Sequence, residues 1–218
     1  MTDALFAEVP LFAGLSSDKL EALERLSLSR TYERGAVIFR QGDPADGLYL
    51  IETGRVKLQL TQQDGEEVIV DLLGEGEYFG EMALIDAEPR STGVVALQET
   101  AIRYLPKADF RHFLSRSNEL AQSLLQGMTE RLRNANRMIE SLATLDVYGR
   151  VARTLMQYAD QEEGRLVVSE PLTQQDIAHM VGASREMVNR VFQDLVRQGL
   201  IRREGRTIVL SGFSAEVA

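Results

Sequence analysis

The sequence predicts a mixed α and β chain: a β-barrel of the jelly-roll type, then a long helix, then a C-terminal winged helix-turn-helix. Three observations predict this order. Residues 30–105 alternate between apolar and polar positions and are broken by glycines, residues 107–145 hold a single glycine and no proline, and residues 173–210 combine two short helical patterns with a hairpin pattern. The domain ranges we expect are 1–116, 117–146 and 147–218.

Composition excludes several classes of protein. The 218 residues are 44% hydrophobic and 26% charged, as is ordinary for a soluble globular chain. Without an apolar run of about 18 residues or a signal-peptide pattern, we expect a cytoplasmic protein with no membrane partner. The chain has no cysteine, which excludes disulfides, thiolate zinc sites and cysteine-ligated clusters. His112 and His179 are far apart in sequence, so we expect no metal.

Charge is distributed unevenly along the chain. The net charge is −9, and residues 1–149 carry all of it, with 15 basic and 24 acidic side chains. Residues 150–218 hold nine of each, and 184–206 contain six arginines against three acids. This local arginine cluster indicates contact with nucleic acid, and the acidic front would discourage non-specific binding to DNA.

The first part of the chain changes from a helical period to a strand period. Residues 10–27 predict a helix, because three leucines recur at helical spacing and a serine at 16 or 17 can cap it. Apolar residues then alternate with polar ones at 56–60 and at 68–72. Short strands separated by closely spaced glycines are typical of a sandwich or a small barrel.

The expected long helix carries a heptad pattern over about three heptads. Apolar residues recur at alternating intervals of four and three, and polar side chains fill most other positions. The helix could lie on its own domain, or it could pair with a second copy in a parallel homodimer; the narrow apolar stripe favours the dimer. The stripe comprises Ala121, Leu125, Met128, Leu132, Ala135, Ile139 and Leu142.

The end of the chain contains the signals of a helix-turn-helix. Asp146 is an expected N-cap for a helix over 147–160, at a hinge, and 161–165 is an expected polar loop. Thr173 to Asp176 matches a capping box, Gly182 ends that helix, and Ser184 caps a second helix that reaches about Gln198. Strands at 200–202 and 207–210 are expected to form the wing.

One segment near the end of the predicted barrel has the groups that a cyclic phosphodiester requires. Gly80 allows close backbone approach, and a short helix starting there would point N–H groups at an anion. Arg90 supplies a permanent cation, Ser91 or Thr92 a hydroxyl, and Glu81 an acceptor for a ribose hydroxyl. A glutamate and an arginine nine residues apart could also be an ordinary ion pair. From residue 79 the segment runs Phe-Gly-Glu-Met-Ala-Leu-Ile-Asp-Ala-Glu-Pro-Arg-Ser-Thr.

The second helix of the helix-turn-helix places three charged side chains on neighbouring parts of one face. Arg185, Glu186 and Arg190 lie at its N-terminal half, which enters the major groove in proteins of this fold. Arginine recognises guanine O6 and N7, and glutamate accepts from cytosine N4. A surface ion pair between Glu186 and Arg190 is the alternative interpretation.

Taken together, these segments resemble the CRP/FNR family of transcription regulators, in the branch of the cyclic-AMP receptor protein. The segment from residue 79 resembles its phosphate-binding cassette, 145–150 its hinge, and 172–190 its helix-turn-helix. The FNR cluster cysteines are missing here. The resemblance implies a ligand site made of Gly80, Glu81, Met82, Ala83, Arg90, Ser91, Thr92, Ala135 and Asn136. It implies a DNA site made of Thr173, Ser184, Arg185, Glu186, Asn189, Arg190 and Arg206, with Thr173 and Arg206 at phosphates.

The resemblance also implies a function. Cyclic AMP is the expected effector, but Ala135 replaces the family's usual hydroxyl at the base, so cyclic GMP and cyclic di-GMP stay open. Partners would be a second copy of the chain, double-stranded DNA with TGTGA-like half-sites, and RNA polymerase. Ligand would favour a dimer whose recognition helices lie about 34 Å apart. A constitutive DNA-binding factor is the alternative, and we expect no enzyme because no nucleophile–base pair or metal cluster is present.

Overall fold

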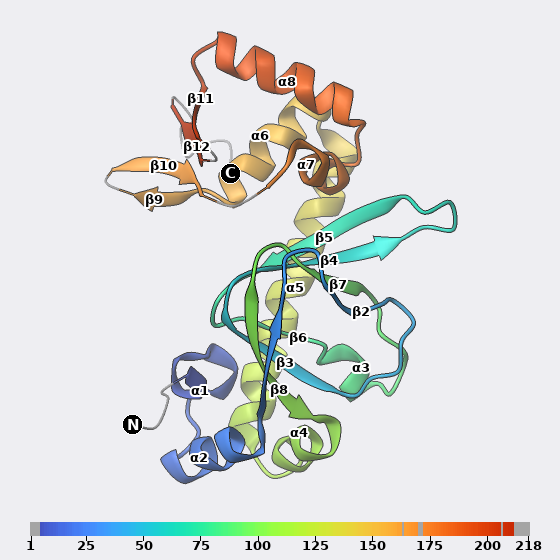
Figure 1. Ribbon diagram of the computed structural model, residues 1–218, viewed down its shortest axis with the longest axis vertical. Helices are drawn as coiled ribbons and strands as arrows, with labels where there is room; N and C mark the ends of the chain where they lie inside the picture. Colours follow the sequence, from blue (N-terminus) through green and yellow to red (C-terminus); the bar gives the residue numbers. More distant parts are fainter. Residues whose placement is uncertain (1–4, 163, 170–171, 206, 212–218) are drawn as a thin grey trace. The chain divides into compact units, whose positions relative to one another are not determined.

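The computed structural model describes residues 5–162, 164–169, 172–205 and 207–211 (Figure 1). Two compact units make up the chain, Met1–Asn134 and Ala135–Ala218. No helix in the described ranges is long and apolar enough to cross a lipid bilayer.

The N-terminal segment forms three short helices instead of the single helix expected over 10–27. They are α1 (Leu5–Glu8), the 3-10 turn η1 (Pro10–Phe12) and α2 (Ser17–Leu26). Ser16 is the N-cap residue of α2, but its side chain makes no capping hydrogen bond. Phe6, Phe12 and Leu23 from these helices are buried in one core cluster. Apolar packing therefore positions the helices more than side-chain capping does.

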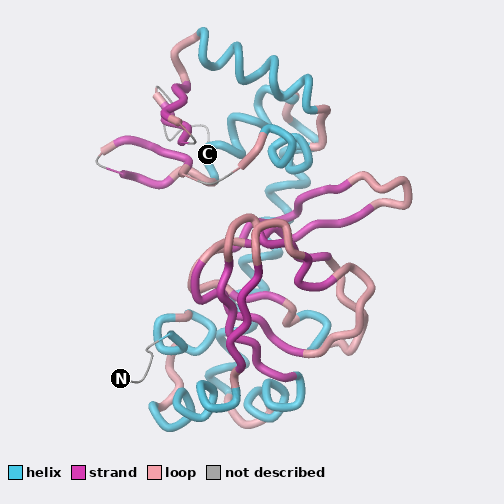
Figure 2. Tube along the Cα trace, in the orientation of Figure 1, coloured by secondary structure: helices cyan, strands magenta, loops and turns pink. Residues whose placement is uncertain are grey.

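Eight short strands form two four-stranded antiparallel sheets, as the alternating pattern and the glycines predict. The strand orders are β1-β8-β3-β6 and β2-β7-β4-β5, and Figure 2 shows the strands in magenta. Phe39, Tyr49 and Phe79 belong to the second core cluster, and the rings of Tyr49 and Phe79 stack 5.1 Å apart. The strands are β1 Leu28–Tyr32, β2 Val37–Phe39, β3 Gly47–Thr53, β4 Val56–Thr61, β5 Glu67–Leu73, β6 Tyr78–Phe79, β7 Gly93–Ala96 and β8 Thr100–Pro106.

Three helices accompany the sheets: α3 (Met82–Ile85), α4 (Lys107–Leu114) and α5 (Asn118–Thr144). One face of α5 packs on its own domain, since Leu120 and Leu124 belong to the same buried cluster as Phe6. Another face carries the heptad residues Leu125, Leu132 and Ile139, whose exposed fractions are 64%, 62% and 63%. The helix therefore uses one side for its own fold and leaves an apolar stripe on another.

Among its described residues, the second unit contains the end of α5, three further helices and a four-stranded sheet in the strand order β11-β12-β10-β9. The expected polar loop at 161–165 is wrong, because β9 and β10 form a hairpin there and β10 pairs with β12. The first helix ends at Gln157, before the expected residue 160. The elements are α6 Val147–Gln157, β9 Asp160–Glu162, β10 Arg165–Val168, α7 Gln174–Val181, α8 Arg185–Arg197, β11 Ile201–Glu204 and β12 Thr207–Leu210.

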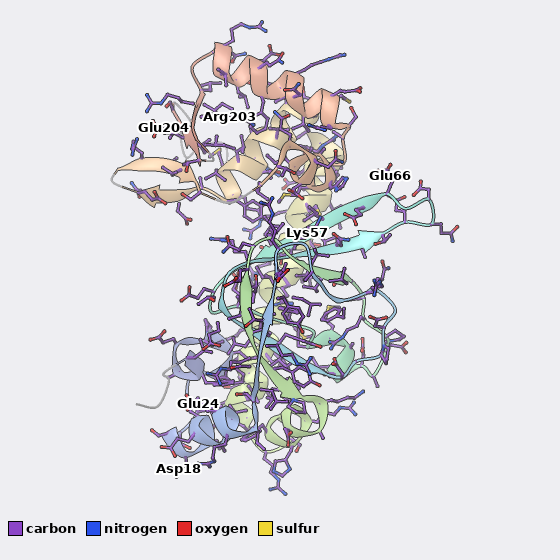
Figure 3. The ribbon with its side chains drawn as sticks, viewed as in Figure 1. Asp18, Glu24, Lys57, Glu66, Arg203 and Glu204 are labelled. Atoms are coloured by element: carbon purple, nitrogen blue, oxygen red, sulfur yellow. The ribbon has the colours of Figure 1, made fainter. Side chains whose placement is uncertain are left out.

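The wing is the β11–β12 hairpin. Its first strand begins one residue later than expected, at Ile201, and ends two residues later than expected, at Glu204. Figure 3 labels Arg203 and Glu204 on it. The Arg203 guanidinium lies 5.2 Å from the ring centroid of Phe192, a buried residue of α8. This contact ties the hairpin to the helix beside it.

Candidate ligand site and nucleic-acid interface

The turn between β6 and α3 brings backbone and arginine unusually close. Gly80 has φ +86°, a conformation that glycine adopts far more readily than other residues. A Cβ atom at this position would lie 2.5 Å from Arg90 Nη1. The predicted short helix is present immediately after the turn, as α3. Both backbone angle and space therefore require glycine here.

Arg90 is buried, with an exposed fraction of 2%, and is held on several sides. Its Nη1 donates to the Gly80 carbonyl at 2.6 Å, and its Nη2 donates to Asp46 Oδ1 at 2.6 Å and to the Gly47 carbonyl at 2.9 Å. The guanidinium carbon lies 4.2 Å from the ring centroid of Phe39. Arg90 Nε is buried and has no hydrogen-bond partner in the described part of the chain.

Asp46 anchors this arginine and was missed by sequence reasoning. The Tyr49 hydroxyl lies 3.0 and 2.9 Å from the two carboxylate oxygens of Asp46. Burial of Asp46 alone would raise its pKa, but the hydrogen bonds from Tyr49 and Arg90 outweigh burial and hold the pKa below its ordinary value. Asp46 therefore stays ionised and neutralises the buried guanidinium.

Glu81 is even more buried, with an exposed fraction of 1%, and pairs with the long helix. Its Oε1 accepts from Arg131 Nη1 at 2.7 Å. Arg131 also donates to the Tyr78 carbonyl and lies over the Tyr78 ring, 5.0 Å from the centroid. The second oxygen, Oε2, is buried with no hydrogen-bond partner among the described residues. Arg131 thus connects α5 to the turn that carries Glu81.

Two buried polar atoms therefore have no hydrogen-bond partner among the described residues. One belongs to the residue just before α3 in the sequence, and the other belongs to a residue shortly after α3. Arg90 Nε is a donor, and Glu81 Oε2 is an acceptor. A buried polar atom without a partner costs about 1–3 kcal/mol, so such atoms usually have a bound partner in the working state. An anionic oxygen and a hydroxyl are the ligand groups whose hydrogen-bonding character matches this donor and this acceptor.

The other residues expected at the ligand are more dispersed. Ala83 is buried and Met82 is exposed, and Ser91 Oγ lies 3.8 Å from Met82 Sδ. Thr92 is half-buried. Ala135 and Asn136 are exposed on α5, one turn beyond Arg131.

The Gly80→Ala variant tests the close approach at the turn. We expect it to displace Arg90 and to weaken nucleotide binding at least about tenfold, because a charge-assisted hydrogen bond contributes 1.5–3 kcal/mol. The matched control is Gly76→Ala, which has a similar φ of +79° but no atom within 4 Å of its Cβ position. Calorimetric titration should show affinity lost in the first variant and kept in the second; equal affinities would refute the role of the close approach.

A third acidic side chain, Asp71 on β5, lies in the electrostatic field of Arg131, Glu77 and Glu81. Burial raises the pKa of Asp71 to about 6, from 3.8, against the opposing charge of Arg131. The folded chain therefore keeps a proton on Asp71 up to about pH 6, whereas the unfolded chain loses it near 3.8. Consequently the ionisation of Asp71 lowers the free energy of unfolding as the pH rises between these values.

The Asp71→Asn variant should remove this pH dependence. At pH 7.5 we expect it to unfold with a free energy about 3 kcal/mol higher than wild type, since one pKa unit corresponds to about 1.4 kcal/mol. In denaturant titrations at several pH values, the difference should shrink as the pH falls below 6, to about a third of its full size at pH 4.5, because the carboxyl of the unfolded chain is still largely ionised there. Asp64→Asn, in the exposed β4–β5 turn, is the control. A difference that is constant with pH would contradict the assignment.

In the second unit, every predicted helix boundary signal near the helix-turn-helix is present. Thr173 Oγ1 accepts from the Asp176 N–H at 3.1 Å and Asp176 Oδ2 accepts from the Thr173 N–H at 3.0 Å, which completes the capping box. Gly182 ends α7 with φ +60°. Ser184 Oγ accepts from the Met187 N–H at 3.2 Å and caps α8. These local bonds fix where the two helices begin.

The side chains expected to contact DNA bases lie exposed at the start of α8. Arg185, Glu186, Asn189 and Arg190 are all exposed, and no ion pair joins Glu186 to Arg190 in the described ranges. A hollow of about 400 Å³ is lined by Gln174, Ser184, Arg185, Glu186 and Asn189. Gln174, the first residue of α7, is the member that sequence reasoning missed. Arg206 lies outside the described residues.

A barrel that buries a glutamate and an arginine beside a short helix, followed by an exposed helix-turn-helix, defines the class of ligand-responsive DNA-binding regulators. Comparison with known families gives the same result. Residues 29–117 match the family described as the cyclic nucleotide-binding domain, and residues 149–212 match the Crp-like helix-turn-helix domain.

Individual relatives extend over nearly the whole chain. It is 34% identical over 213 residues to the CRP-like cAMP-activated global transcriptional regulator of Mycobacterium tuberculosis, over 96% of this chain and 95% of that protein. It is 35% identical over 207 residues to the cAMP-activated global transcriptional regulator Vfr of Pseudomonas aeruginosa, over 89% and 95%. The solved structure of the c-di-GMP responsive global regulator CLP of Xanthomonas campestris has a TM-score of 0.77 and 27% identity, over 91% and 100%.

The chain therefore belongs to the CRP/FNR family, as a cyclic-nucleotide-responsive, DNA-binding transcription regulator of the CRP-like branch. These relatives are named as transcriptional regulators and not as enzymes.

Proposed function

We propose that the protein is a cytoplasmic homodimer in which cyclic AMP favours a conformation that binds a palindromic DNA site with TGTGA-like half-sites. Residues 1–116 bind the nucleotide, 117–146 form the dimerisation helix and hinge, and 147–218 bind DNA. When it is bound to this DNA site, the dimer acts on RNA polymerase. The observation that carries the proposal is the complementary pair of unsatisfied buried atoms, Glu81 Oε2 and Arg90 Nε.

Within this proposal the cassette residues have distinct tasks. Arg90 binds the cyclic phosphate, Glu81 Oε2 accepts from the ribose hydroxyl, and the N-terminal turn of α3 offers backbone donors from Met82 and Ala83. Ser91 adds a hydroxyl at the phosphate, with Thr92 beside it. The chemistry is a salt bridge plus hydrogen bonds, so nothing in it cleaves the phosphodiester.

The base would be recognised by α5. Asn136 offers both a donor and an acceptor to the edge of the base, and Ala135 offers neither. A ligand contacted by α5 would couple the barrel to the helix that joins the two domains. The Glu81–Arg131 pair, at 2.7 Å, supports this coupling because it already connects the ligand-binding turn to α5.

Cyclic di-GMP is the second candidate effector. Ala135 removes a hydroxyl that would favour adenine, and the structurally similar regulator CLP is described as c-di-GMP responsive. The relatives from Mycobacterium tuberculosis and Pseudomonas aeruginosa are described as cAMP-activated and are more similar in sequence, which supports cyclic AMP as the first choice.

Parallel calorimetric titrations with cyclic AMP, cyclic GMP and cyclic di-GMP test the proposal. We expect micromolar binding of cyclic AMP and weaker or no binding of the other two. Tightest binding of cyclic di-GMP would replace the effector but keep the mechanism. Binding of none of the three would contradict the sensing function and favour a constitutive DNA-binding factor.

A further inference from the structure

Two amide side chains are joined beside the charged residues at the start of α8. Gln174 Nε2 donates to Asn189 Oδ1 at 3.3 Å, across fifteen residues of sequence and between the two helices of the helix-turn-helix. Both side chains line the hollow of about 400 Å³ that Arg185 and Glu186 also line. Asn189 lies one helical turn beyond Arg185, so it belongs to the same surface of α8.

The backbone on both sides of this amide pair is fixed. Gln174 is the first residue of α7 and lies inside the capping box, between Thr173 and Asp176, and Asn189 follows the capped first turn of α8. An exposed neutral hydrogen bond contributes little to folding. Its effect is instead to hold two flexible side chains in one arrangement before a partner arrives, which lowers the entropic cost of binding.

The pair has a defined set of remaining hydrogen-bonding groups. Each amide has one acceptor oxygen and one NH₂ group, and the bond between them uses the Asn189 oxygen and one N–H of Gln174. The Gln174 oxygen, the second N–H of Gln174 and both N–H groups of Asn189 are left. If the two amides exchange roles, one unbonded oxygen and three N–H donors are again left. In the major groove adenine presents the N7 acceptor beside the N6 donor, whereas guanine presents two acceptors.

We infer that Gln174 and Asn189 together recognise an adenine in each half-site, at a base pair other than those contacted by Arg185, Glu186 and Arg190. In the bonded arrangement one lone pair of the Asn189 oxygen is used by Gln174, whereas both lone pairs of the adjacent Gln174 oxygen are free to accept from adenine N6 while the Asn189 NH₂ group donates to N7. The Gln174 oxygen takes over the acceptor role. This inference rests on the proposed DNA-binding function and adds a specificity-determining residue on α7.

The test is selection from a palindromic DNA library, randomised at every position of the half-site, with the full-length protein in saturating cyclic AMP. At one position of the half-site, wild type should prefer A·T about tenfold, as expected for a base contact with two hydrogen bonds. This base pair should differ from those contacted by Arg185, Glu186 and Arg190. Gln174→Ala and Asn189→Ala should each abolish that preference, and the double variant should lose no more than either single one. Gln193→Ala, an exposed amide one turn further along α8, is the control and should keep it.

The possible outcomes separate this inference from the proposed function. If wild type selects no palindrome, DNA recognition by the dimer fails, and the inference fails with it. If wild type selects a palindrome but both single variants keep every base preference, only the amide pair is refuted. Losses at two different positions that add in the double variant would also refute a joint contact. Because both residues are neutral, the salt dependence of binding should stay unchanged.

Discussion

Replacing Arg90 with leucine should lower the affinity for cyclic AMP by about a hundredfold or more, because at least two charge-assisted hydrogen bonds of 1.5–3 kcal/mol each are lost. The reason lies in the burial of the guanidinium, whose exposed fraction is 2%. Water cannot replace the missing charge in such a site, so the phosphate would be buried without a counter-charge. Calorimetric titration of the purified variant measures the loss directly.

Two further variants separate binding from folding. Arg103→Leu removes a partly buried ion pair with Glu52 elsewhere on the barrel and should keep wild-type affinity. Arg90→Leu leaves Asp46 without its arginine partner, so the double variant Asp46→Asn/Arg90→Leu restores neutrality. If this double variant folds like wild type and still binds cyclic AMP with unchanged affinity, Arg90 is not the phosphate-binding residue.

Replacing Leu132 with glutamate should dissociate the dimer. Leu132 is 62% exposed in the single chain, and the dimer would bury it from both copies. Burying one such side chain contributes about 1.5–3 kcal/mol, so the symmetric loss is about 3–6 kcal/mol before the cost of burying two carboxylates. Sedimentation should show a monomer at micromolar concentration. Affinity for a palindromic DNA site should fall at least about a hundredfold, since the two half-sites would no longer bind one molecule.

The matched control introduces the same charge outside the apolar stripe. Gln126 is exposed on α5 and is not a heptad residue, so Gln126→Glu should stay dimeric and bind DNA like wild type. A Leu132→Glu protein that sediments as a dimer would show that α5 is not the dimer interface, and that the stripe has another partner.

Elements whose signals are local could be predicted from the sequence. Asp146, Thr173 and Ser184 cap their helices through bonds that span three residues, so the residues themselves indicate where each helix begins. The β9–β10 hairpin was missed for the opposite reason. The residues of β9 are all exposed and polar and look like a loop. They form a strand because they pair with β10, which in turn pairs with β12 far along the chain, and this pairing leaves no pattern in the residues of β9 themselves.

The same distinction applies to the site. Gly80, Glu81 and Arg90 lie within eleven residues and were found as one motif. Their partners Asp46 and Arg131 come from 44 and 50 residues away, and only folding shows that they are needed. A buried charge must be compensated, so partners were to be expected, but the sequence contains many acids and arginines that could serve.

In the proposed mechanism, nucleotide binding and DNA binding by this protein are coupled. The most direct test measures, at fixed salt, the affinity of the full-length protein for a palindromic TGTGA duplex without nucleotide and with saturating cyclic AMP. Allosteric coupling of 1–3 kcal/mol predicts an affinity that rises by about 5–150-fold with cyclic AMP and does not rise in Arg90→Leu. Equal affinity in the absence and presence of cyclic AMP, cyclic GMP and cyclic di-GMP would contradict the account.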